Sequence, residues 1–420
     1  MATTTKDQLA DLLEIIAASL DIPDEVHENA VQKYREVGDW LEEKDEANGR
    51  REPEIYSQGS FSLGTVTRPI DANGEYDVDL VYERDLRKAS VTQEQLKEEA
   101  GEHLRSFVEF LGSSHKECPE LGSGRRCWTL NYPDQFHMDI LPSIPDDAGR
   151  KQKHDQAKTK ILITDKEVYH WIPSNPKGYA NWFRKQMEIQ FLEKRAALAR
   201  AELRSKGMTL TEEMIKAAAE EVPEYKVKTA LQRAIQILKR HRDFYFKNDD
   251  KNRPFSIILT TLAAKSYANE DNLVDALLNL IRGMPEHIED REENGERVAW
   301  VPNPVNETEN FAERWQDEEH PDREAAFRAW LQKADEDITH ALQGGGIHKI
   351  IQILGDSLGE SVVKEAATRM GHRYQEESQS GSLEVASGTG AILSGSRTGG
   401  STTPVRRHTF YGDEEKKSES

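Results

Sequence analysis

Residues 76–82, YDVDLVY, alternate between acidic and apolar side chains. Because successive side chains of a β-strand point to opposite faces, this alternation predicts a strand with Asp77 and Asp79 on one face and an apolar, core-packed other face. Two carboxylates this close repel each other unless a cation lies between them. Oxygen ligands at this spacing suit Mg2+, which keeps several waters and accepts substrate phosphates. The segment therefore predicts a sheet that is buried on one face and binds a cation on the other.

A second acidic strand is predicted at residues 136–142, FHMDILP. Its alternation places apolar side chains in the core and His137 and Asp139 on the other face. If this strand lies beside the first, Asp77, Asp79 and Asp139 converge. Such a trio predicts a site for two metal ions, in which one lowers the pKa of an attacking hydroxyl and the other stabilises a leaving pyrophosphate. A coincidence of two surface strands is the alternative interpretation.

A glycine-containing segment, QGSFSLGT at residues 58–65, precedes the first acidic strand. Its glycines allow the backbone to approach a ligand closely. Backbone N–H groups and the Ser60 hydroxyl can hold a phosphate, especially if Ser60 opens a helix. A Gly-Ser pair alone indicates little, since ordinary turns contain it. The glycine turn followed by two acidic strands is what predicts a nucleotide site.

Helices and strands alternate in the first part of the chain. Residues 7–45 have the apolar spacing of a helix, interrupted at Pro23. Residues 92–111 also predict a helix, with a capping box that starts at Thr92. Short β-rich segments surround this second helix. Together they predict a mixed α/β core over residues 50–165.

From about residue 175 the chain is predicted to be almost wholly helical. Apolar helices are expected at residues 227–246, 255–268 and 272–283. The charge-rich stretches at residues 188–222 and 286–299 are expected to be solvated helix faces and loops.

After about residue 376 the composition changes to Ser, Gly and Thr, which predicts a disordered tail. The tail ends in a segment whose only aromatic residues are Phe410 and Tyr411. This pair is interpreted either as part of a docking peptide or as simple disorder.

Charge and composition limit the partners. The formal net charge is -20, from 56 Lys and Arg against 76 Asp and Glu, so long nucleic acids are repelled unless basic residues are segregated. Two cysteines, Cys118 and Cys127, cannot form a disulfide framework and are expected to be reduced. The sequence has no apolar run of about 20 residues and no secretory signal, so we expect a cytoplasmic protein without a membrane segment.

The glycine turn and the two acidic strands together resemble the polymerase-β-type nucleotidyltransferase superfamily. More narrowly, they resemble the bacterial cyclic GMP-AMP synthase-like enzymes (CD-NTases), relatives of oligoadenylate synthase. The gap between Ser60 and Asp77 is longer than is usual in minimal nucleotidyltransferases. The resemblance continues through the helical half and covers roughly residues 50–370. The similar helical segments are SNPKGYANWF (174–183), ALQRAIQILKRHRD (230–243), PFSIILTTLA (254–263) and VPNPVNETENFAERW (301–315).

This resemblance implies an α+β fold of two lobes with the active site between them. A polymerase-β-like nucleotidyltransferase core with a mixed β-sheet carries the aspartates, and a helical, oligoadenylate-synthase-like C-terminal lobe closes over the nucleotide. The expected segments are N-terminal helices that pack on the core (1–49), the catalytic core (50–170), the helical lobe (171–375) and the disordered tail (376–420).

The family pattern also implies catalytic roles. Asp77 and Asp79 match the two shared metal ligands, and Asp139 matches the third carboxylate, which binds the metal at the acceptor hydroxyl. These three residues are therefore the expected catalytic and metal-binding residues. The implied cofactor is a pair of Mg2+ ions, for which Mn2+ can substitute.

The implied nucleotide-binding residues are Gln58, Gly59, Ser60, Lys239 and Ser256. The first three match the family's phosphate-binding turn. Lys239 matches a helix lysine, and Ser256 a helix-opening serine, that contact the donor triphosphate. From the residues alone, Lys239 can equally be a solvated helix residue and Ser256 a helix N-cap.

The resemblance implies an enzyme that joins nucleoside triphosphates, ATP among them, into a cyclic di- or trinucleotide second messenger. It would release pyrophosphate and act in anti-phage defence, with a separate effector reading the product. An ancillary regulator, either a ubiquitin-transfer-like conjugating protein or a HORMA-type activator, would act on or near the C-terminal tail. Direct DNA binding is not expected, because two cysteines cannot supply the zinc insertion with which animal cyclic GMP-AMP synthase grips DNA.

Two other functions stay open at this stage. One is linear nucleotidyl transfer, either oligoadenylate synthesis or protein or RNA nucleotidylation. The other is an inactive nucleotide-binding scaffold, against which the complete aspartate trio argues. His241, Arg242 and Asp243 spell a kinase catalytic-loop triplet, but they lie in an amphipathic helix without a kinase Gly-rich loop or DFG motif. No motif indicates the base, the linkage or the ring size.

Overall fold

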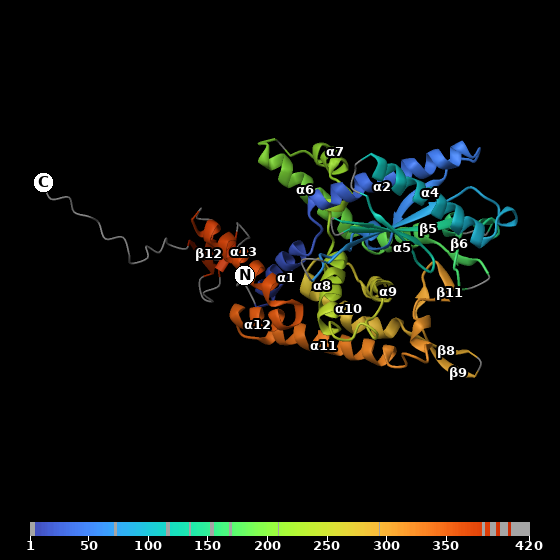
Figure 1. Cartoon of the computed structure of the whole chain (residues 1–420). Helices are drawn as coiled ribbons and strands as arrows, with labels where there is room; N and C mark the ends of the chain where they lie inside the picture. The colour runs from blue at the N-terminus through green and yellow to red at the C-terminus, as the bar shows by residue number, and fades with distance from the viewer. Residues whose placement is uncertain are drawn as a thin grey trace. The chain divides into compact units, whose positions relative to one another are not determined.

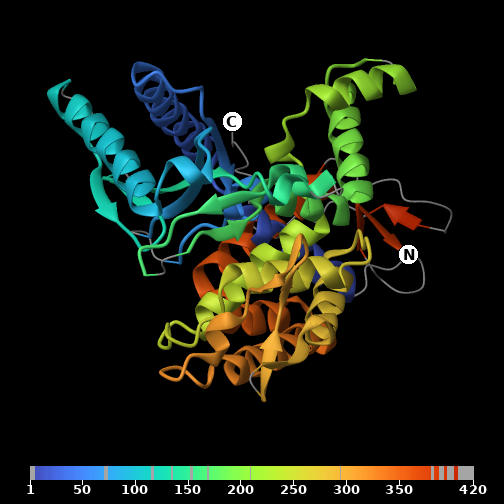
Figure 2. The ribbon, with the colours of Figure 1, turned by 90° about the vertical axis from the view of Figure 1, so that its right-hand side faces the viewer.

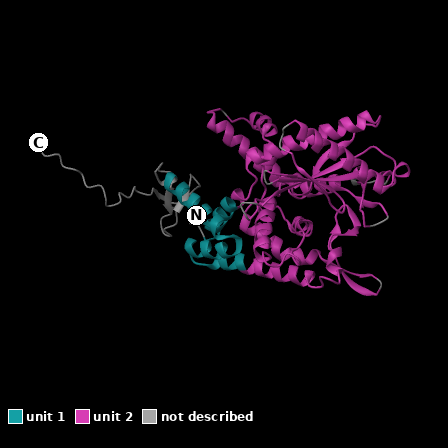
Figure 3. Ribbon diagram, in the orientation of Figure 1, with its two compact units in different colours: residues 1–16, 337–420 teal, residues 17–336 magenta. Residues whose placement is uncertain are grey.

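The computed structural model describes most of the chain. The described residues are 5–70, 74–114, 118–133, 136–151, 155–167, 170–208, 210–293, 295–379, 383–386, 392–394 and 402–404. The chain forms two compact units, one of residues 17–336 and the other of residues 1–16 and 337–420 (Figure 3). The four segments expected from the sequence were defined by their type of secondary structure and not by compactness. Their boundaries stay a prediction.

A mixed sheet forms the centre of the larger unit (Figure 1). Its main path is, in order, β1 (Glu54–Gln58), β2 (Tyr76–Glu83), β5 (Phe136–Pro145), β4 (Trp128–Tyr132) and β3 (Glu120–Ser123), and β6 (Ile161–Ile163) and β7 (Ile172–Ser174) continue from β5. The central pair, β2 and β5, is parallel, while the other pairs are antiparallel. The predicted mixed sheet is confirmed.

One face of this sheet packs against α2 (Asp24–Ala47) and α4 (Gln93–Ser113). These two helices lie on the opposite side of the sheet from α8 (Ala230–Tyr245), α9 (Ser256–Ser266) and α10 (Leu273–Gly283) (Figures 1 and 2). The alternating apolar residues of the two acidic strands are at most 2% exposed, and they are Val78, Leu80, Met138 and Ile140. Burial of each such side chain contributes about 1.5–3 kcal/mol. This burial forces the alternating acidic residues onto the other face.

The predicted capping box of α4 is present. The Thr92 hydroxyl accepts a hydrogen bond from the Gln95 backbone at 3.1 Å, and the Gln95 side chain accepts one from the Thr92 backbone at 2.9 Å. The predicted break in the N-terminal helical stretch is also confirmed, because α1 (Thr5–Ser19) ends before Pro23, the N-cap of α2.

The rest of the larger unit is mainly helical. Its helices are α3 (Gly59–Leu63), α5 (Pro176–Gln186), α6 (Glu188–Ser205), α7 (Glu212–Glu221), α8 (Ala230–Tyr245), α9 (Ser256–Ser266), α10 (Leu273–Gly283) and residues 323–336 of α11 (Arg323–Gln343). The three apolar helices predicted beyond residue 226 correspond to α8, α9 and α10 and are confirmed.

The expectation of almost wholly helical structure is wrong between residues 289 and 310. Four strands lie there, namely β8 (Glu289–Glu293), β9 (Glu296–Trp300), β10 (Pro302–Asn303) and β11 (Asn306–Asn310). Gly295 between β8 and β9 has a φ of 85°, which a tight hairpin requires and which glycine adopts without strain. The Asn-Gly dipeptide at 294–295 is a hairpin signal, and the high charge around it hid the alternation.

The smaller unit contains the end of α11 together with α12 (Ile347–Leu358) and α13 (Glu360–Gln379). Asp11 accepts hydrogen bonds from Arg373 at 2.7 Å and Tyr374 at 2.9 Å. Within the predicted tail the structure describes three short antiparallel strands, β12 (Leu383–Ala386), β13 (Ile392–Ser394) and β14 (Thr402–Pro404). The remainder from residue 405 on, including Phe410 and Tyr411, lies outside the described residues. Over the described ranges, no helix is both long and apolar enough to span a bilayer.

Candidate active site

The parallel pairing of β2 and β5 brings the three predicted aspartates together. In its register Asp79 lies opposite Asp139, and Asp77 lies opposite His137. Neighbouring strands are about 4.8 Å apart, and residues that pair in register point to the same face of the sheet. The three carboxylates therefore share one face, across two adjacent strands, as the sequence predicted.

Burial and repulsion act together on the central carboxylate. The pKa of Asp79 is raised to about 7, first by burial and then by the charges of Asp77 and Asp139. The neighbouring Asp139 accepts a hydrogen bond from the Thr129 hydroxyl at 2.6 Å, which fixes one of its oxygens. A divalent cation between the carboxylates would remove the repulsion, and an all-oxygen donor set suits a hard ion. The residues present thus fit a magnesium-type ion.

His137 is a member of this cluster to which the sequence assigned no role. It forms ion pairs with Asp77 and, at 3.0 Å, with Glu75. The hydrogen bond to Asp77 raises the pKa of His137 to about 9, against the opposing effect of burial. Among the described residues, no group of three His, Cys, Asp or Glu side chains is arranged as a preformed metal site. Strand alternation already placed His137 on the acidic face.

The glycine turn lies directly against the aspartates. β1 ends at Gln58, which pairs in register with Asp79, and the short helix α3 begins at Gly59 rather than at Ser60. Gly59 has a φ of 63°, and a Cβ built on it would collide with the Asp79 carboxylate. Both constraints require glycine. We call residues 58–65 the phosphate turn, after the function predicted for them.

A row of side chains before and along α8 holds the far end of the phosphate turn. These side chains, which we call the α8 row, donate hydrogen bonds to four successive backbone carbonyls. The bonds run from Gln232 to Leu63 (2.9 Å), Lys228 to Gly64 (2.8 Å), Lys239 to Thr65 (2.9 Å) and Gln236 to Val66 (2.8 Å). Because each carbonyl is otherwise without a helical or sheet partner, the row determines how the turn sits beside the aspartates.

A cleft of about 1060 Å3 lies between the sheet and the helices within the larger unit. The sheet side contributes Gly59, Ser60, Asp77 and Asp79, and the helical side includes Lys239 and Ser256. Of the predicted site residues, Gln58 and Asp139 do not line the cleft directly, although both pair in register with Asp79. Six of the eight predicted site residues thus line one cleft, and the other two are register partners of Asp79.

Lys239 is buried, so its alternative as a solvated helix residue is wrong. Burial, followed by the nearby Arg242, lowers the pKa of Lys239 to about 7. Ser256 is the first residue of α9, but Phe255 occupies the N-cap position and no side-chain cap bond forms. Instead the Ser256 hydroxyl accepts a hydrogen bond from Arg242 at 3.0 Å. The N-cap alternative for Ser256 is therefore wrong as well.

Most of the basic residues of this cleft were not predicted from the sequence. Besides Lys239 and, on the sheet side, Arg68, they are Arg242, Lys247, Lys251, Arg253 and Arg323 on the helical side. Arg242 is buried and donates to the Pro254 carbonyl at 3.0 Å, which connects α8 to the start of α9. The signal was the basic spacing within residues 239–253, which the kinase-like triplet obscured. The cations of the helical side face the acidic strands across the cleft, an arrangement that suits a metal-bound polyphosphate.

A family comparison supports this assignment of the core. Residues 53–142, which contain the phosphate turn and both acidic strands, match the nucleotidyltransferase domain described as cyclic GMP-AMP synthase DncV-like. The c-di-GMP synthase of Roseivirga ehrenbergii is 29% identical over 413 residues, which are 98% of this chain and 100% of that protein.

Solved structures share the fold over most of the chain. The CD-NTase CdnG of Bradyrhizobium diazoefficiens, solved in complex with GTP, superposes with a TM-score of 0.65 at 22% identity, covering 86% of this chain and 99% of that one. CdnC of E. coli MS115-1, solved in a CdnC:HORMA-deltaN complex, gives a TM-score of 0.55 at 13% identity, covering 84% and 96%. These likenesses extend the common fold well beyond residues 53–142.

Proposed function

We propose that this chain, which belongs to the DncV-like nucleotidyltransferases through its residues 53–142, joins nucleoside triphosphates into a cyclic di- or trinucleotide and releases pyrophosphate. The observation that carries the proposal is the register of Asp79 against Asp139 beside a glycine turn that only glycine can form. The full-length similarity to a protein named c-di-GMP synthase supports cyclisation over linear transfer.

In the proposed mechanism the role of the three aspartates is to bind metal ions. Asp77, Asp79 and Asp139 would hold two Mg2+ ions, for which Mn2+ can substitute. When bound, the ions activate the acceptor hydroxyl and neutralise the departing pyrophosphate. Thr129 orients Asp139 through its hydrogen bond, and burial of Asp79 strengthens its preference for a cation over water.

The remaining site residues would bind the donor triphosphate. Backbone N–H groups around Gly59, with the Ser60 hydroxyl, face the phosphates from the sheet side. Lys239 and Ser256 approach from the helical side, and Arg242 holds the Ser256 hydroxyl. Gln58 contributes by fixing the start of the turn against Asp79.

GTP is proposed as one substrate, because relatives are named as a c-di-GMP synthase and as a CD-NTase in complex with GTP. The sequence resemblance adds ATP as a further candidate. We place the reaction in the cytoplasm, where these triphosphates are available.

The proposed biological role is anti-phage signalling, in which a separate effector reads the product. A HORMA-type regulator is supported by the CdnC:HORMA complex of E. coli, whose cyclase shares this fold. A ubiquitin-transfer-like conjugating protein that acts on the C-terminal tail is the other candidate regulator. Either regulator would act on or near the tail, and this role of the tail is refuted if deletion of residues 380–420 changes neither partner binding nor cellular activity.

The test is incubation of the full chain with labelled GTP, ATP or both, and Mg2+, followed by phosphatase treatment and mass spectrometry. A phosphatase-resistant product without free ends is expected, and EDTA should abolish it. A ladder of species with terminal phosphates would instead establish linear transfer. The scaffold alternative requires that Asp77→Ala with Asp79→Ala leave cellular function intact.

A further inference from the structure

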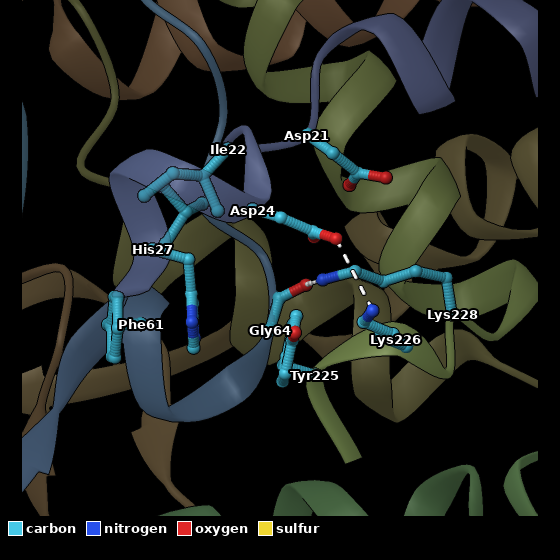
Figure 4. Close-up of a pocket in the computed structure, with 10 residues that line it drawn as sticks. Asp21, Ile22, Asp24, His27, Phe61, Gly64, Tyr225, Lys226 and Lys228 are labelled. Atoms are coloured by element: carbon cyan, nitrogen blue, oxygen red, sulfur yellow. Dashed lines mark hydrogen bonds and ion pairs between the residues drawn. The ribbon is translucent and has the colours of Figure 1, made fainter. Parts of the chain in front are cut away.

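A second cavity, of about 210 Å3, lies in the larger unit behind the phosphate turn (Figure 4). Phe61 and Gly64 of the turn line it together with His27 of α2 and with Tyr225 and Lys228, which precede α8. It shares only Val66 with the residues that line the catalytic cleft. The turn therefore separates two distinct spaces, with the aspartates on one side and this cavity on the other.

Flat aromatic surfaces form one wall of the cavity. The His27 ring stacks on Tyr225 with ring centres 4.2 Å apart and on Phe61 with centres 5.0 Å apart. Burial and the nearby Lys228 lower the pKa of His27, which keeps this ring neutral at physiological pH. His27 is the middle ring of this stack (Figure 4), so its edge and the outer faces of Phe61 and Tyr225 are the aromatic surfaces left for a flat apolar guest.

A desolvated cation lies beside these rings. The Lys228 ammonium donates to the Gly64 carbonyl at 2.8 Å (Figure 4) and, among the described residues, forms no ion pair with a carboxylate. The nearby Asp21 is held by Arg233 at 2.7 Å and Gln236 at 2.9 Å, while Asp24 pairs with Lys226 at 3.3 Å. Burial lowers the pKa of Lys228 to about 8. The charge of Asp21 opposes this lowering, but both Asp21 oxygens accept hydrogen bonds from Arg233 and Gln236, so an anion in the cavity would supply a direct countercharge.

The size of the cavity limits the guest. An apolar cavity of about 150 Å3 holds benzene, and sites for drug-sized ligands start at about 300 Å3. The cavity lies between these values, which leaves room for one ring with a small substituent.

We propose that this cavity is a regulatory site for a planar, single-ring monoanion, of the aromatic carboxylate class, and that its occupant acts on the phosphate turn. The ring would lie against the Tyr225 ring and the edge of His27, and the carboxylate would pair with Lys228. The same ammonium donates the hydrogen bond of the α8 row to the Gly64 carbonyl. A bound carboxylate therefore either weakens this bond by competing for the ammonium or strengthens it by fixing the Lys228 side chain. Binding in this way changes how the turn presents its N–H groups to the triphosphate.

The binding half of this proposal is independent of the reaction, whereas its regulatory half rests on the proposed function. Binding is tested first, with no nucleotide present, by saturation-transfer NMR of benzoate and nicotinate with the full chain. We expect Kd values of about 1 mM or tighter, as befits ligands of nine heavy atoms. Nicotinamide, which lacks the negative charge of nicotinate, and cyclohexanecarboxylate, which lacks the flat ring of benzoate, test these two requirements of the site. Each should bind at least about tenfold more weakly than its aromatic carboxylate counterpart.

Two variants place the ligand. Lys228→Met removes the cation and Tyr225→Leu removes the stacked wall, and each should weaken benzoate at least about tenfold. The controls are Lys216→Met on the exposed face of α7 and Tyr245→Leu at the end of α8, which is 44% exposed. Should both controls weaken binding as much as the cavity variants, or should no carboxylate bind the wild type, the site is refuted. Tyr225→Leu keeps the test valid if Lys228→Met does not fold.

The regulatory half is measured as the ratio of kcat/KM for GTP with and without saturating benzoate. We expect a ratio that departs from one by about threefold or more in the wild type and in Tyr245→Leu, and that returns to one in Tyr225→Leu. Binding at Lys228 with an unchanged ratio overturns regulation. If no nucleotide product forms under any condition, the proposed function fails while the binding result still stands.

Discussion

Asp79 on β2 and Asp139 on β5 lie directly opposite each other in the parallel register of the central strand pair. The glycine that begins α3 sits so close that a side chain on it would strike the Asp79 carboxylate. Two carboxylates and the phosphate turn are therefore packed around one position, and each can be varied separately.

Asp139→Asn should reduce turnover at least about 100-fold with little change in folding, because it removes charge from the metal site but keeps the shape and the Thr129 contact. Product formation from labelled GTP measures this effect. Asp85→Asn is the control, since that carboxylate is half-exposed and pairs with Arg51 away from the cleft. Equal activity of Asp139→Asn and the wild type would remove Asp139 from the catalytic set.

Gly59→Ala should abolish most activity and destabilise the chain by about 1–3 kcal/mol, because the residue has a positive φ and the new methyl group displaces Asp79. Gly49→Ala is a matched control, with a φ of 69° and no atom within 4 Å of the built Cβ. It carries the same backbone strain without the collision, so it should lose stability but not turnover. Thermal melts and steady-state rates separate the two effects.

Gln232→Glu tests the α8 row without disturbing the helix. The new side chain can still accept hydrogen bonds from the Thr229 N–H and hydroxyl, but it sets a carboxylate against the Leu63 carbonyl. We expect kcat/KM for the triphosphate to fall about tenfold at unchanged helix content. The reason is that a hydrogen bond is lost and replaced by a repulsive contact, which costs about 1–3 kcal/mol.

The control for this variant is Gln95→Glu, which occupies the same capping-box position of α4, far in sequence from the turn. Its rate should stay at the wild-type value. A fall in rate of equal size in both variants would assign the effect to helix capping instead of to the turn.

Acid sensitivity should depend on Asp165. Burial alone would raise the pKa of its carboxyl, but hydrogen bonds from Arg125 and Arg126 outweigh burial and hold the pKa at about 2. A pKa below the unfolded value means stability that is present above about pH 4 and is lost as the pH falls toward 2. Asp165→Asn should therefore cost about 1–2 kcal/mol at pH 7, a range that allows for the partial exposure of both arginines.

Denaturant melts across pH measure this cost. The difference between Asp165→Asn and the wild type should shrink steadily below about pH 4, where the wild-type carboxyl also loses its charge. A difference that is independent of pH would show that the variant disrupts packing rather than an ion pair.

Local patterns were sufficient for the parts of the site that one segment determines. Alternation alone places Asp77 and Asp79 on one face, because the period of a strand is two whatever surrounds it. The same reasoning holds for the capping box at Thr92, whose partners are three residues apart. The hairpin at β8 and β9 was missed because charge on both faces weakened the alternation that signals a strand.

What tertiary structure decided is every contact between distant segments. Asp139 lies beside Asp79 only because β2 and β5 pair in this register. The prediction from the sequence depended on that pairing and could not establish it. The Gln232 side chain donates a hydrogen bond to the Leu63 carbonyl, 169 positions away in the sequence, so no local pattern could predict this contact. In the sequence, the basic residues after Lys239 have the pattern of an ordinary charged helix end. Only the fold places them in the cleft opposite the acidic strands. Side-chain types and their spacing thus determined the chemistry available to this protein, while long-range packing, which depends on the whole chain at once, decided which groups meet.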